Sequence, residues 1–190
     1  MSFKIVVMGT SLGGLSALQT VLGNLPADFP LPVAIVQHRH KNSDDTLRGM
    51  IQEYTSLPVR EVEDKDEISP GKVYLAPADY HLLVEPGFFA LSTDEPVSYA
   101  RPSIDVLFDS AADIYGAQVI GVILTGANQD GMQGLKKIKA QGGKTIVQEP
   151  STAASSIMPA AAISAVAVDW ILSLPDIAPL LVNLGYSIRK

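Results

Sequence analysis

The chain has 190 residues, of which 47% are hydrophobic and 18% are charged, so it can build a packed core and lacks the composition of a disordered protein. Its formal net charge is −6, and no block of Lys and Arg interrupts this balance, which argues against nucleic acid and anionic membrane surfaces as partners. It has no cysteine, which excludes disulfides, cysteine-ligated metal and thiol catalysis.

Apolar runs alternate along the chain with segments of helical periodicity. In chain order, the pattern predicts a strand at 5–8, a helix at 14–23, a strand at 33–36, a helix capped by Ser43 or Asp44 and ending near residue 54, a strand at 59–62, three short runs at 73–76, 81–84 and 88–91, a helix at 104–115, a strand at 119–124, a helix at 131–141, a strand at 144–147, a helix at 159–165, a strand at 166–168 and a helix at 173–185.

The three short runs are separated by turn residues and predict an antiparallel meander. The remaining alternation predicts an α/β fold with a mainly parallel sheet covered on both faces, whose ligands bind at the carboxyl ends of the strands. With neither a repeat nor a long linker, we expect a single domain over residues 1–190. No apolar stretch reaches the roughly 18 residues of a membrane span, which predicts a cytoplasmic protein without membrane insertion.

Ser11 stands in the first candidate site, the run Gly9-Thr10-Ser11-Leu12-Gly13-Gly14. Gly-x-Ser-x-Gly is typical of a tight strand-to-helix turn that exposes a nucleophilic serine. A glycine-rich nucleotide or phosphate loop is the competing interpretation. A dinucleotide loop needs a glycine where Ser11 stands and an acid near the end of the next strand, where this chain has Gln37-His38. The residues favour the nucleophile.

His38 follows the second strand and would lie near Ser11 if the first two strands are neighbours. A serine needs such a base, because its protonated hydroxyl is a poor nucleophile. The alternative is an ordinary polar histidine of a loop. His38 and His40 also have the spacing of a metal pair, but with His81 as the only further histidine and no cysteine, we expect no metal site.

Asp130 follows the most apolar strand and supplies an acid that orients and stabilises a protonated imidazole. A competing role for Asp130 is the N-cap of the helix at 131–141. A nucleophile, a base and an acid at three strand ends of one sheet form a more specific signal than any one of them. The chain order Ser, His, Asp differs from the Ser, Asp, His order of α/β-hydrolases.

Taken together, the motifs resemble the chemotaxis receptor methylesterases of the CheB type over about residues 3–185. The runs that carry the resemblance are 9–14 (GTSLGG), 36–38 (VQH), 74–82 (YLAPADYHL), 101–108 (RPSIDVLF), 121–126 (GVILTG), 130–131 (DG) and 148–159. The resemblance implies a three-layer α/β/α fold with a mostly parallel sheet and an antiparallel hairpin. It also implies hydrolysis of glutamate γ-methyl esters on chemoreceptor signalling helices and, in many members, deamidation of receptor glutamines.

The resemblance assigns the nucleophile to Ser11, the base to His38 and the acid to Asp130, in agreement with the residues themselves. We expect the backbone N–H groups of Leu12 and Ala127 to hold the oxyanion, and we expect no metal or organic cofactor. The implied partners are methylated chemoreceptor signalling helices and a separate receiver or methyltransferase protein. Arg39, His40 and Arg101 have two equally open interpretations: they contact an acidic receptor surface, or they form a solvated rim of the site.

The chain departs from the family pattern at Leu12, Ala127, Asn128 and Ala160, where the family usually has a small or hydroxyl residue, methionine, glycine and a basic residue. It also begins at the catalytic strand, without the receiver domain of typical members. Met1 directly before a strand favours a stand-alone enzyme over a fragment. The altered residues Leu12, Ala127 and Asn128 motivate one alternative, a non-catalytic signalling or scaffold module. A second alternative is a nucleotide-binding domain that uses residues 9–14.

Overall fold

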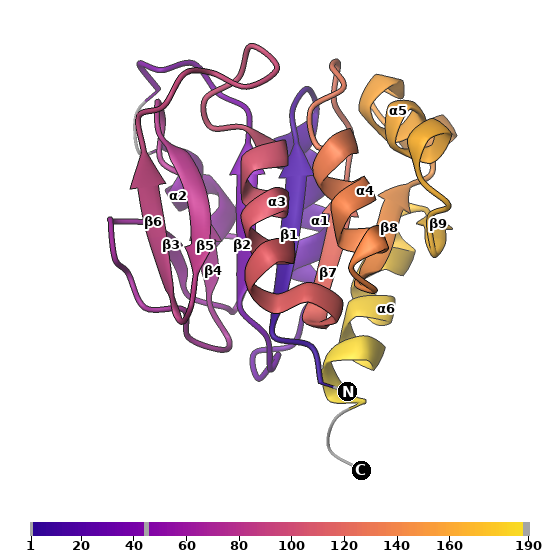
Figure 1. Cartoon of the computed structure of the whole chain (residues 1–190). Coiled ribbons are helices and arrows are strands. Elements are labelled where there is room, and N and C mark those ends of the chain that lie inside the picture. The colour runs from indigo at the N-terminus through magenta and orange to yellow at the C-terminus, as the bar shows by residue number, and fades with distance from the viewer. Residues whose placement is uncertain (1, 44–45, 188–190) are drawn as a thin grey trace.

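A computed structural model describes residues 2–43 and 46–187, which form a parallel sheet, a separate antiparallel hairpin and covering helices (Figure 1). The sheet has seven strands in the order β3-β4-β2-β1-β7-β8-β9, and all neighbouring pairs are parallel. Its strands are β1 (Ile5–Thr10), β2 (Val33–Gln37), β3 (Val59–Glu61), β4 (Val73–Leu75), β7 (Val119–Ile123), β8 (Lys144–Gln148) and β9 (Trp170–Leu172). The hairpin pairs β5 (His81–Glu85) with β6 (Phe88–Ser92).

Helices cover both faces of this sheet and give the molecule three layers (Figure 1). They are α1 (Gly14–Gly23), α2 (Thr46–Gln52), α3 (Ile104–Tyr115), α4 (Met132–Ala140), α5 (Ile157–Ala165) and α6 (Leu174–Tyr186), with short 3₁₀ turns at Gly116–Gln118 and Pro150–Thr152. None of the described helices combines the length and the hydropathy that a transmembrane span requires.

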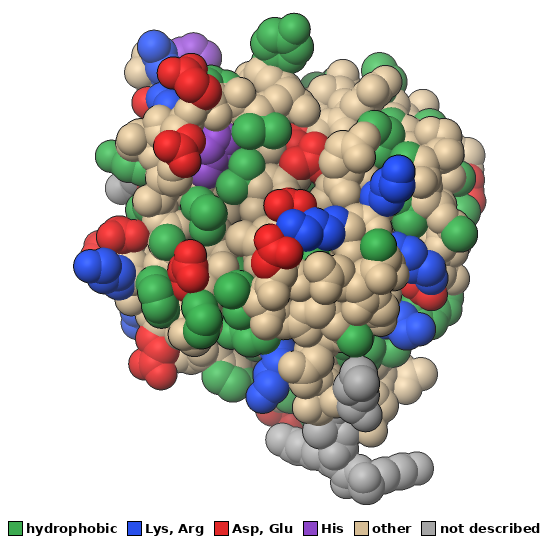
Figure 2. Space-filling model, in the orientation of Figure 1, with side chains coloured by type: hydrophobic (Ala, Val, Ile, Leu, Met, Phe, Trp, Pro, Cys, Tyr) green, Lys and Arg blue, Asp and Glu red, His purple; other side chains and the backbone are tan. Residues whose placement is uncertain are grey.

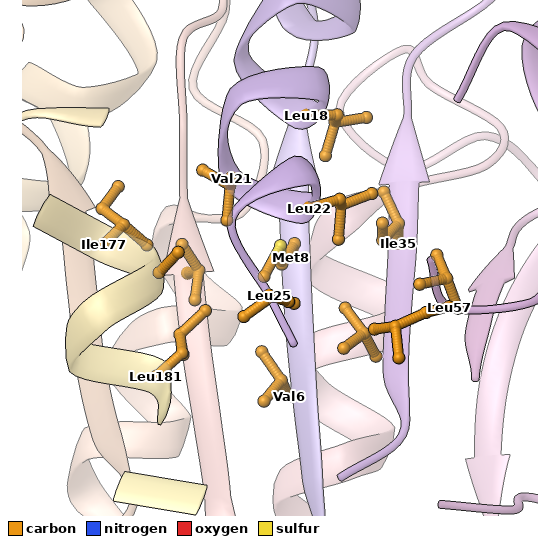
Figure 3. Packing of buried hydrophobic residues seen from close by; sticks show 14 of the residues in the cluster. Val6, Met8, Leu18, Val21, Leu22, Leu25, Ile35, Leu57, Ile177 and Leu181 are labelled. Carbon is orange, nitrogen blue, oxygen red and sulfur yellow. The ribbon is translucent and has the colours of Figure 1, made fainter. Parts of the chain in front are cut away.

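Two hydrophobic cores follow from the alternation of side chains along the strands. In β1, Val6 and Met8 belong to the core under α1 and α6, whereas Ile5 and Val7 belong to the core under α3, α4 and the hairpin. Figure 3 shows the first core, in which Leu22 of α1 packs over the strands. All of β1 is buried, because the strand lies in the middle of the sheet and is covered on both faces.

The helices α3 and α4 lie side by side over the second core (Figure 1). Lys137 of α4 joins them on the outside through ion pairs with Asp109 and Asp113 of α3, at 2.8 and 2.7 Å. In Figure 2, the histidine side chains visible on this face lie in the upper part of the molecule, at the end to which the strand arrows point in Figure 1. This end is the carboxyl edge of the sheet.

The structure confirms the predicted three-layer α/β/α class and corrects two elements. The run 73–76 is not part of a meander: its residues form β4, which inserts between β3 and β2, and the antiparallel unit is the β5–β6 hairpin alone. Val73, Tyr74 and Leu75 are all buried, which is the pattern of a strand inside a covered parallel sheet.

The last strand is Trp170–Leu172 rather than 166–168. The carboxylate of Asp169 accepts hydrogen bonds from the Thr145 N–H and hydroxyl groups at 2.9 Å, so the chain joins β8 only after Asp169. The predicted cap Asp44 lies outside the described residues, and α2 begins at Thr46 and ends at Gln52, two residues before the expected end.

Candidate active site

Ser11 follows β1 directly and is fixed to the ends of two neighbouring strands. Its N–H donates to the carbonyl of Thr125 after β7 at 3.0 Å. Its own carbonyl accepts from Gln37 Nε2 at the end of β2 and from Gly14 N, both at 2.9 Å. The backbone of Ser11 is therefore held between β2 and β7, while no hydrogen bond to its hydroxyl occurs within the described residues.

Two glycines make this strand-to-helix turn possible. Gly13 has a φ of +79°, a left-handed conformation that L side chains rarely adopt, and a Cβ there would collide with Ala154. A Cβ on Gly14 would collide with the Gln37 side-chain oxygen. The same Gln37 amide donates to the carbonyl groups of Ser11 and His38, so the position where a dinucleotide site would need an acid instead supports the serine turn.

His38 follows β2 and contacts Asp130, as the sequence predicts. Its backbone N–H donates to the Thr10 carbonyl at 3.0 Å, and its Nε2 lies 2.7 Å from Asp130 Oδ2. The carboxylate only accepts hydrogen bonds, so Nε2 carries the proton and Nδ1 keeps the lone pair. The His38 side chain is 12% exposed and that of Asp130 is fully buried. The pair lies at the edge of the core with only the imidazole reaching the surface.

Asp130 also caps a helix, but not the one that the sequence suggested. The N-terminus of α4 has no side-chain cap at Gly131. Asp130 instead accepts from Ser103 Oγ at 2.8 Å and from the N–H groups of Ile104 and Asp105 at 2.7 and 3.0 Å, at the start of α3. One carboxylate can therefore both cap a helix and contact His38, because the helix that Asp130 caps is α3 and not the α4 helix that follows it in the chain.

The environment of Asp130 favours its ionised form. Burial would raise the pKa of this carboxyl group, but the hydrogen bonds from His38 and from the N–H groups of Asp105 and Ile104 outweigh burial and hold the pKa below its usual range. The positive end of the α3 dipole acts in the same direction. Asp130 is thus a permanently charged acceptor for His38 at neutral pH.

The second ring nitrogen of His38 contacts a residue that sequence reasoning noted only as a departure. His38 Nδ1 lies 2.9 Å from Nδ2 of Asn128, and no hydrogen bond joins His38 to Ser11 within the described residues. Ser103 was also missed, although it stands in the run 101–108 that carries the resemblance. The missed contacts join residues far apart in the chain, so local sequence contained no signal for their partners.

Two backbone N–H groups, one next to Ser11 in the chain and one near its hydrogen-bonding partner Thr125, are unused within the described residues. Among the described residues, the N–H groups of Leu12 and Ala127 donate to no protein acceptor, whereas the neighbouring Ser11 and Gly126 N–H groups bond to Thr125 and Ser155 carbonyls. Leu12 directly follows Ser11, and Ala127 follows the segment to which the Ser11 N–H is bonded. An oxyanion hole requires backbone donors that no protein acceptor already uses, which is the property that these two N–H groups share.

Ser11, His38 and Asn128 line one open cavity of about 660 Å³. Its other walls are residues 39–41, Asp79, Pro96 and residues 98–102. Tyr99, at the tip of the last segment, is fully exposed. Arg101 anchors this segment through a 2.7 Å ion pair with Asp79 and hydrogen bonds to the carbonyls of residues 93 and 94.

The structure distinguishes between the basic residues near the site. The Arg39 side chain is only 7% exposed, and it pairs with Glu61 at 2.6 Å and donates to the Ala76 carbonyl, so it braces the strand ends rather than offering a receptor contact. His81 bridges the Glu95 carbonyl and the Ser103 N–H, and residues 2–43 and 46–187 contain no cluster of three side chains placed to hold a metal ion. With a cavity lined by Ser11, His38 and Asn128 at the carboxyl edge of a parallel sheet, the molecule has the construction of an α/β enzyme.

Comparison with known proteins narrows this class. The family model described as CheB methylesterase matches residues 6–181. A relative from Leptospira interrogans, named as a protein-glutamate methylesterase/protein-glutamine glutaminase, is 47% identical over 97% of this chain and 96% of its own length. A relative from Anaeromyxobacter dehalogenans, named protein-glutamate methylesterase/protein-glutamine glutaminase 2, is 42% identical over 92% of this chain, but over only 51% of its own length.

The same likeness extends to three dimensions. The crystal structure of the Thermotoga maritima CheB methylesterase catalytic domain superposes with a TM-score of 0.93 at 37% identity, covering 97% of this chain and all of that chain. The chain belongs to the CheB methylesterase family.

Proposed function

We propose that this protein hydrolyses the γ-methyl esters of glutamate side chains on chemoreceptor signalling helices and releases methanol, with Ser11, His38 and Asp130 as its catalytic triad. The observation that carries the proposal is the 2.7 Å hydrogen bond between His38 and the buried Asp130, beside a cavity that Ser11 also lines. Membership of the family and the names of the relatives from Leptospira and Thermotoga supply the substrate class.

In this mechanism, Ser11 Oγ attacks the ester carbonyl carbon while His38 Nδ1 takes the hydroxyl proton. The N–H groups of Leu12 and Ala127 hold the negative charge that develops on the carbonyl oxygen. Asp130 stabilises the imidazolium, which then gives its proton to the departing methoxide. Water hydrolyses the acyl-enzyme by the same steps in reverse, so protein groups and water carry each step without a metal or organic cofactor.

Hydrolysis of receptor glutamines is the second proposed activity. The relatives' names include protein-glutamine glutaminase, and an amide passes through the same tetrahedral intermediate as an ester. The difference lies in the leaving group, because His38 must then protonate the amide nitrogen of the tetrahedral intermediate, which leaves as ammonia, rather than the methoxide oxygen. Release of ammonia from an unmethylated receptor, measured beside methanol release, separates the two activities.

The proposed substrate also indicates where the protein acts and which partners it contacts. We place the protein in the cytoplasm, acting as one catalytic unit over residues 1–190 on methylated receptor helices, with a separate receiver or methyltransferase protein as a further partner. Among the basic residues at the cavity, His40 and Lys41 are exposed and Arg101 is half-buried, whereas Arg39 is committed to Glu61. Because Arg101 is paired with Asp79, the exposed Lys41 is the group that gives the mouth of the cavity a positive charge suited to an acidic receptor surface.

The test compares wild type with Ser11→Ala on a methylated receptor signalling fragment and on p-nitrophenyl acetate, a small ester that needs no receptor recognition. We expect Ser11→Ala to lower both rates by roughly a thousandfold or more. Ser164→Ala, which removes an exposed hydroxyl from α5, is the matched control and keeps the wild-type rates. A fluorophosphonate probe followed by mass spectrometry locates the labelled serine without any substrate.

Three outcomes would contradict the proposal. Retained activity in Ser11→Ala would refute Ser11 as the nucleophile. A fluorophosphonate label on a serine other than Ser11 would refute the same assignment. Hydrolysis of neither ester by wild type would favour the non-catalytic signalling module.

A further inference from the structure

Asn128 is oriented by its own main-chain loop. Its Oδ1 accepts the N–H of Asp130, two residues later, at 3.0 Å. This local turn leaves the amide nitrogen as the group that faces His38, at 2.9 Å from Nδ1. An amide nitrogen only donates and the oxygen only accepts, so the pair of contacts fixes which way the Asn128 amide points.

The two nitrogens of His38 therefore have opposite roles. Nε2 donates to Asp130, and Nδ1 accepts from Asn128. A neutral imidazole has a single in-plane lone pair, and here the Asn128 amide uses it. This lone pair is the one that must receive the proton of Ser11, whose hydroxyl has no partner among the described residues.

We propose that Asn128 is a positioning residue that occupies the proton-accepting nitrogen of His38 in the resting enzyme, and that Ser11 reaches this nitrogen only when the Asn128 amide withdraws. The inference rests on the proposed triad and adds a gating step to it. Once Nδ1 holds the serine proton it can no longer accept from the amide, so Asn128 stays displaced until that proton leaves with methanol. The resting contact then forms again.

The first test uses two substitutions that treat the amide nitrogen differently. In Asn128→Ser, the hydroxyl still accepts from the Asp130 N–H in a local turn but offers no amide to His38. We expect its rate of fluorophosphonate labelling at Ser11 and its kcat on p-nitrophenyl acetate to rise about two- to tenfold, the range set by one net hydrogen bond. KM for this small ester stays unchanged, because the displaced contact involves the base and not the bound ester.

Asn128→Asp is the near-isosteric control. It keeps an oxygen for the Asp130 N–H but places a carboxylate oxygen opposite Nδ1, which favours an imidazole protonated on both nitrogens. We expect both rates to fall below those of wild type. A Ser variant no faster than wild type, with the fold retained by circular dichroism, overturns the gating role. So does an Asp variant as fast as wild type.

The second test needs no variant and no substrate. Nitrogen-15 spectra of the neutral His38 ring in wild type should show the proton on Nε2 and an accepting Nδ1, with a through-hydrogen-bond coupling to Asn128 Nδ2. A proton on Nδ1 overturns the proposal whatever the activity. If Ser11→Ala remains active, the proposed triad fails, and the spectra still decide the contact between His38 and Asn128.

Discussion

Asp130 combines two structural tasks that are separable in most proteins. Its carboxylate accepts four hydrogen bonds, one from His38 and three from the first turn of α3 and its cap residue Ser103. The three donors at the start of α3 hold the Asp130 carboxylate in place independently of His38. The imidazole therefore hydrogen-bonds to an acceptor that does not have to reorganise. Such preorganisation is how enzymes obtain strong electrostatic effects from few groups.

Asp105, at the start of α3, in turn accepts a hydrogen bond from the backbone of α4. Its carboxylate accepts the Gly134 N–H of α4 at 2.7 Å, while its own N–H donates to Asp130. Burial and the nearby charge of Asp130 raise the pKa of Asp105 from 3.8 to about 6, against the lowering effect of the α4 N–H groups. The two carboxylates thus cap each other's helices and repel each other.

Asp105 makes stability dependent on pH. Its folded pKa is the higher one, so the folded state retains a proton that the unfolded state loses, and this contribution to stability disappears as pH rises from about 4 to about 6. We expect Asp105→Asn to have a smaller fall in the free energy of unfolding over this window than wild type. Because Asp105 is partly exposed, the difference is of order 1 kcal/mol. Urea unfolding at pH 4, 5, 6 and 7 measures it, and equal pH dependence in both proteins would contradict it.

At the scale of elements, the rim segment 97–100 is a two-residue turn in an unfavourable conformation. Val97 and Ala100 exchange two backbone hydrogen bonds at 2.9 and 3.1 Å. Between them, Ser98 and Tyr99 have φ values of 50° and 62°, a left-handed region that suits Asn and Gly. The turn therefore presents the exposed Tyr99 beside the cavity at a cost in backbone strain.

Relieving this strain should stabilise the fold. We expect replacement of Ser98-Tyr99 by Asn-Gly to raise the free energy of unfolding by about 1 kcal/mol, after the greater flexibility of glycine in the unfolded chain is subtracted. The control is Ala-Ala at the same positions, which removes both side chains but keeps the strained turn and should bring no gain. Urea titration measures the change, and an equal effect of both replacements would argue against strain.

Sequence patterns predicted most elements because local periodicity determines which residues form strands and helices. They failed at β4, because an apolar run such as Val73–Leu75 is compatible with both an antiparallel meander and a parallel sheet. The strand with which it pairs, here β2, determines which of the two forms. They identified Ser11, His38 and Asp130 as candidates because each follows a strand. They did not reveal the Ser103–Asp130 or Asn128–His38 contacts, whose partners are separated by 27 and 90 residues.

At the scale of the molecule, the site rests on two cores that meet at β1. Alternate residues of this strand support the α1–α6 layer and the α3–α4 layer, and Ser11 extends from its end. The carboxyl edge of the sheet, where the proposed site lies, is thus fixed by packing on both faces of the sheet. Close-packed cores respond to the loss of even a few methylene groups, whereas exposed apolar side chains contribute little.

Leu22→Ala tests this support. Leu22 is fully buried in α1, so we expect the free energy of unfolding to fall by about 2–5 kcal/mol through lost burial and a residual cavity. Met50→Ala on α2, where Met50 is 43% exposed, should change stability by less than about 0.5 kcal/mol. Thermal and urea unfolding give both values. A similar loss in the two variants would show that the α1 core does not dominate stability.

The carboxylate shared by His38 and α3 has a consequence for how related sequences diverge. Selection on folding alone preserves Asp130, because losing it would leave the N–H groups of Ile104 and Asp105 at the start of α3 without acceptors. Within the described residues, the hydroxyl of Ser11 makes no such bond, and its proposed role is in the reaction alone. If the proposed triad holds, a related sequence that has lost the activity would keep the aspartate longer than the serine. The serine is then the better marker of an active enzyme.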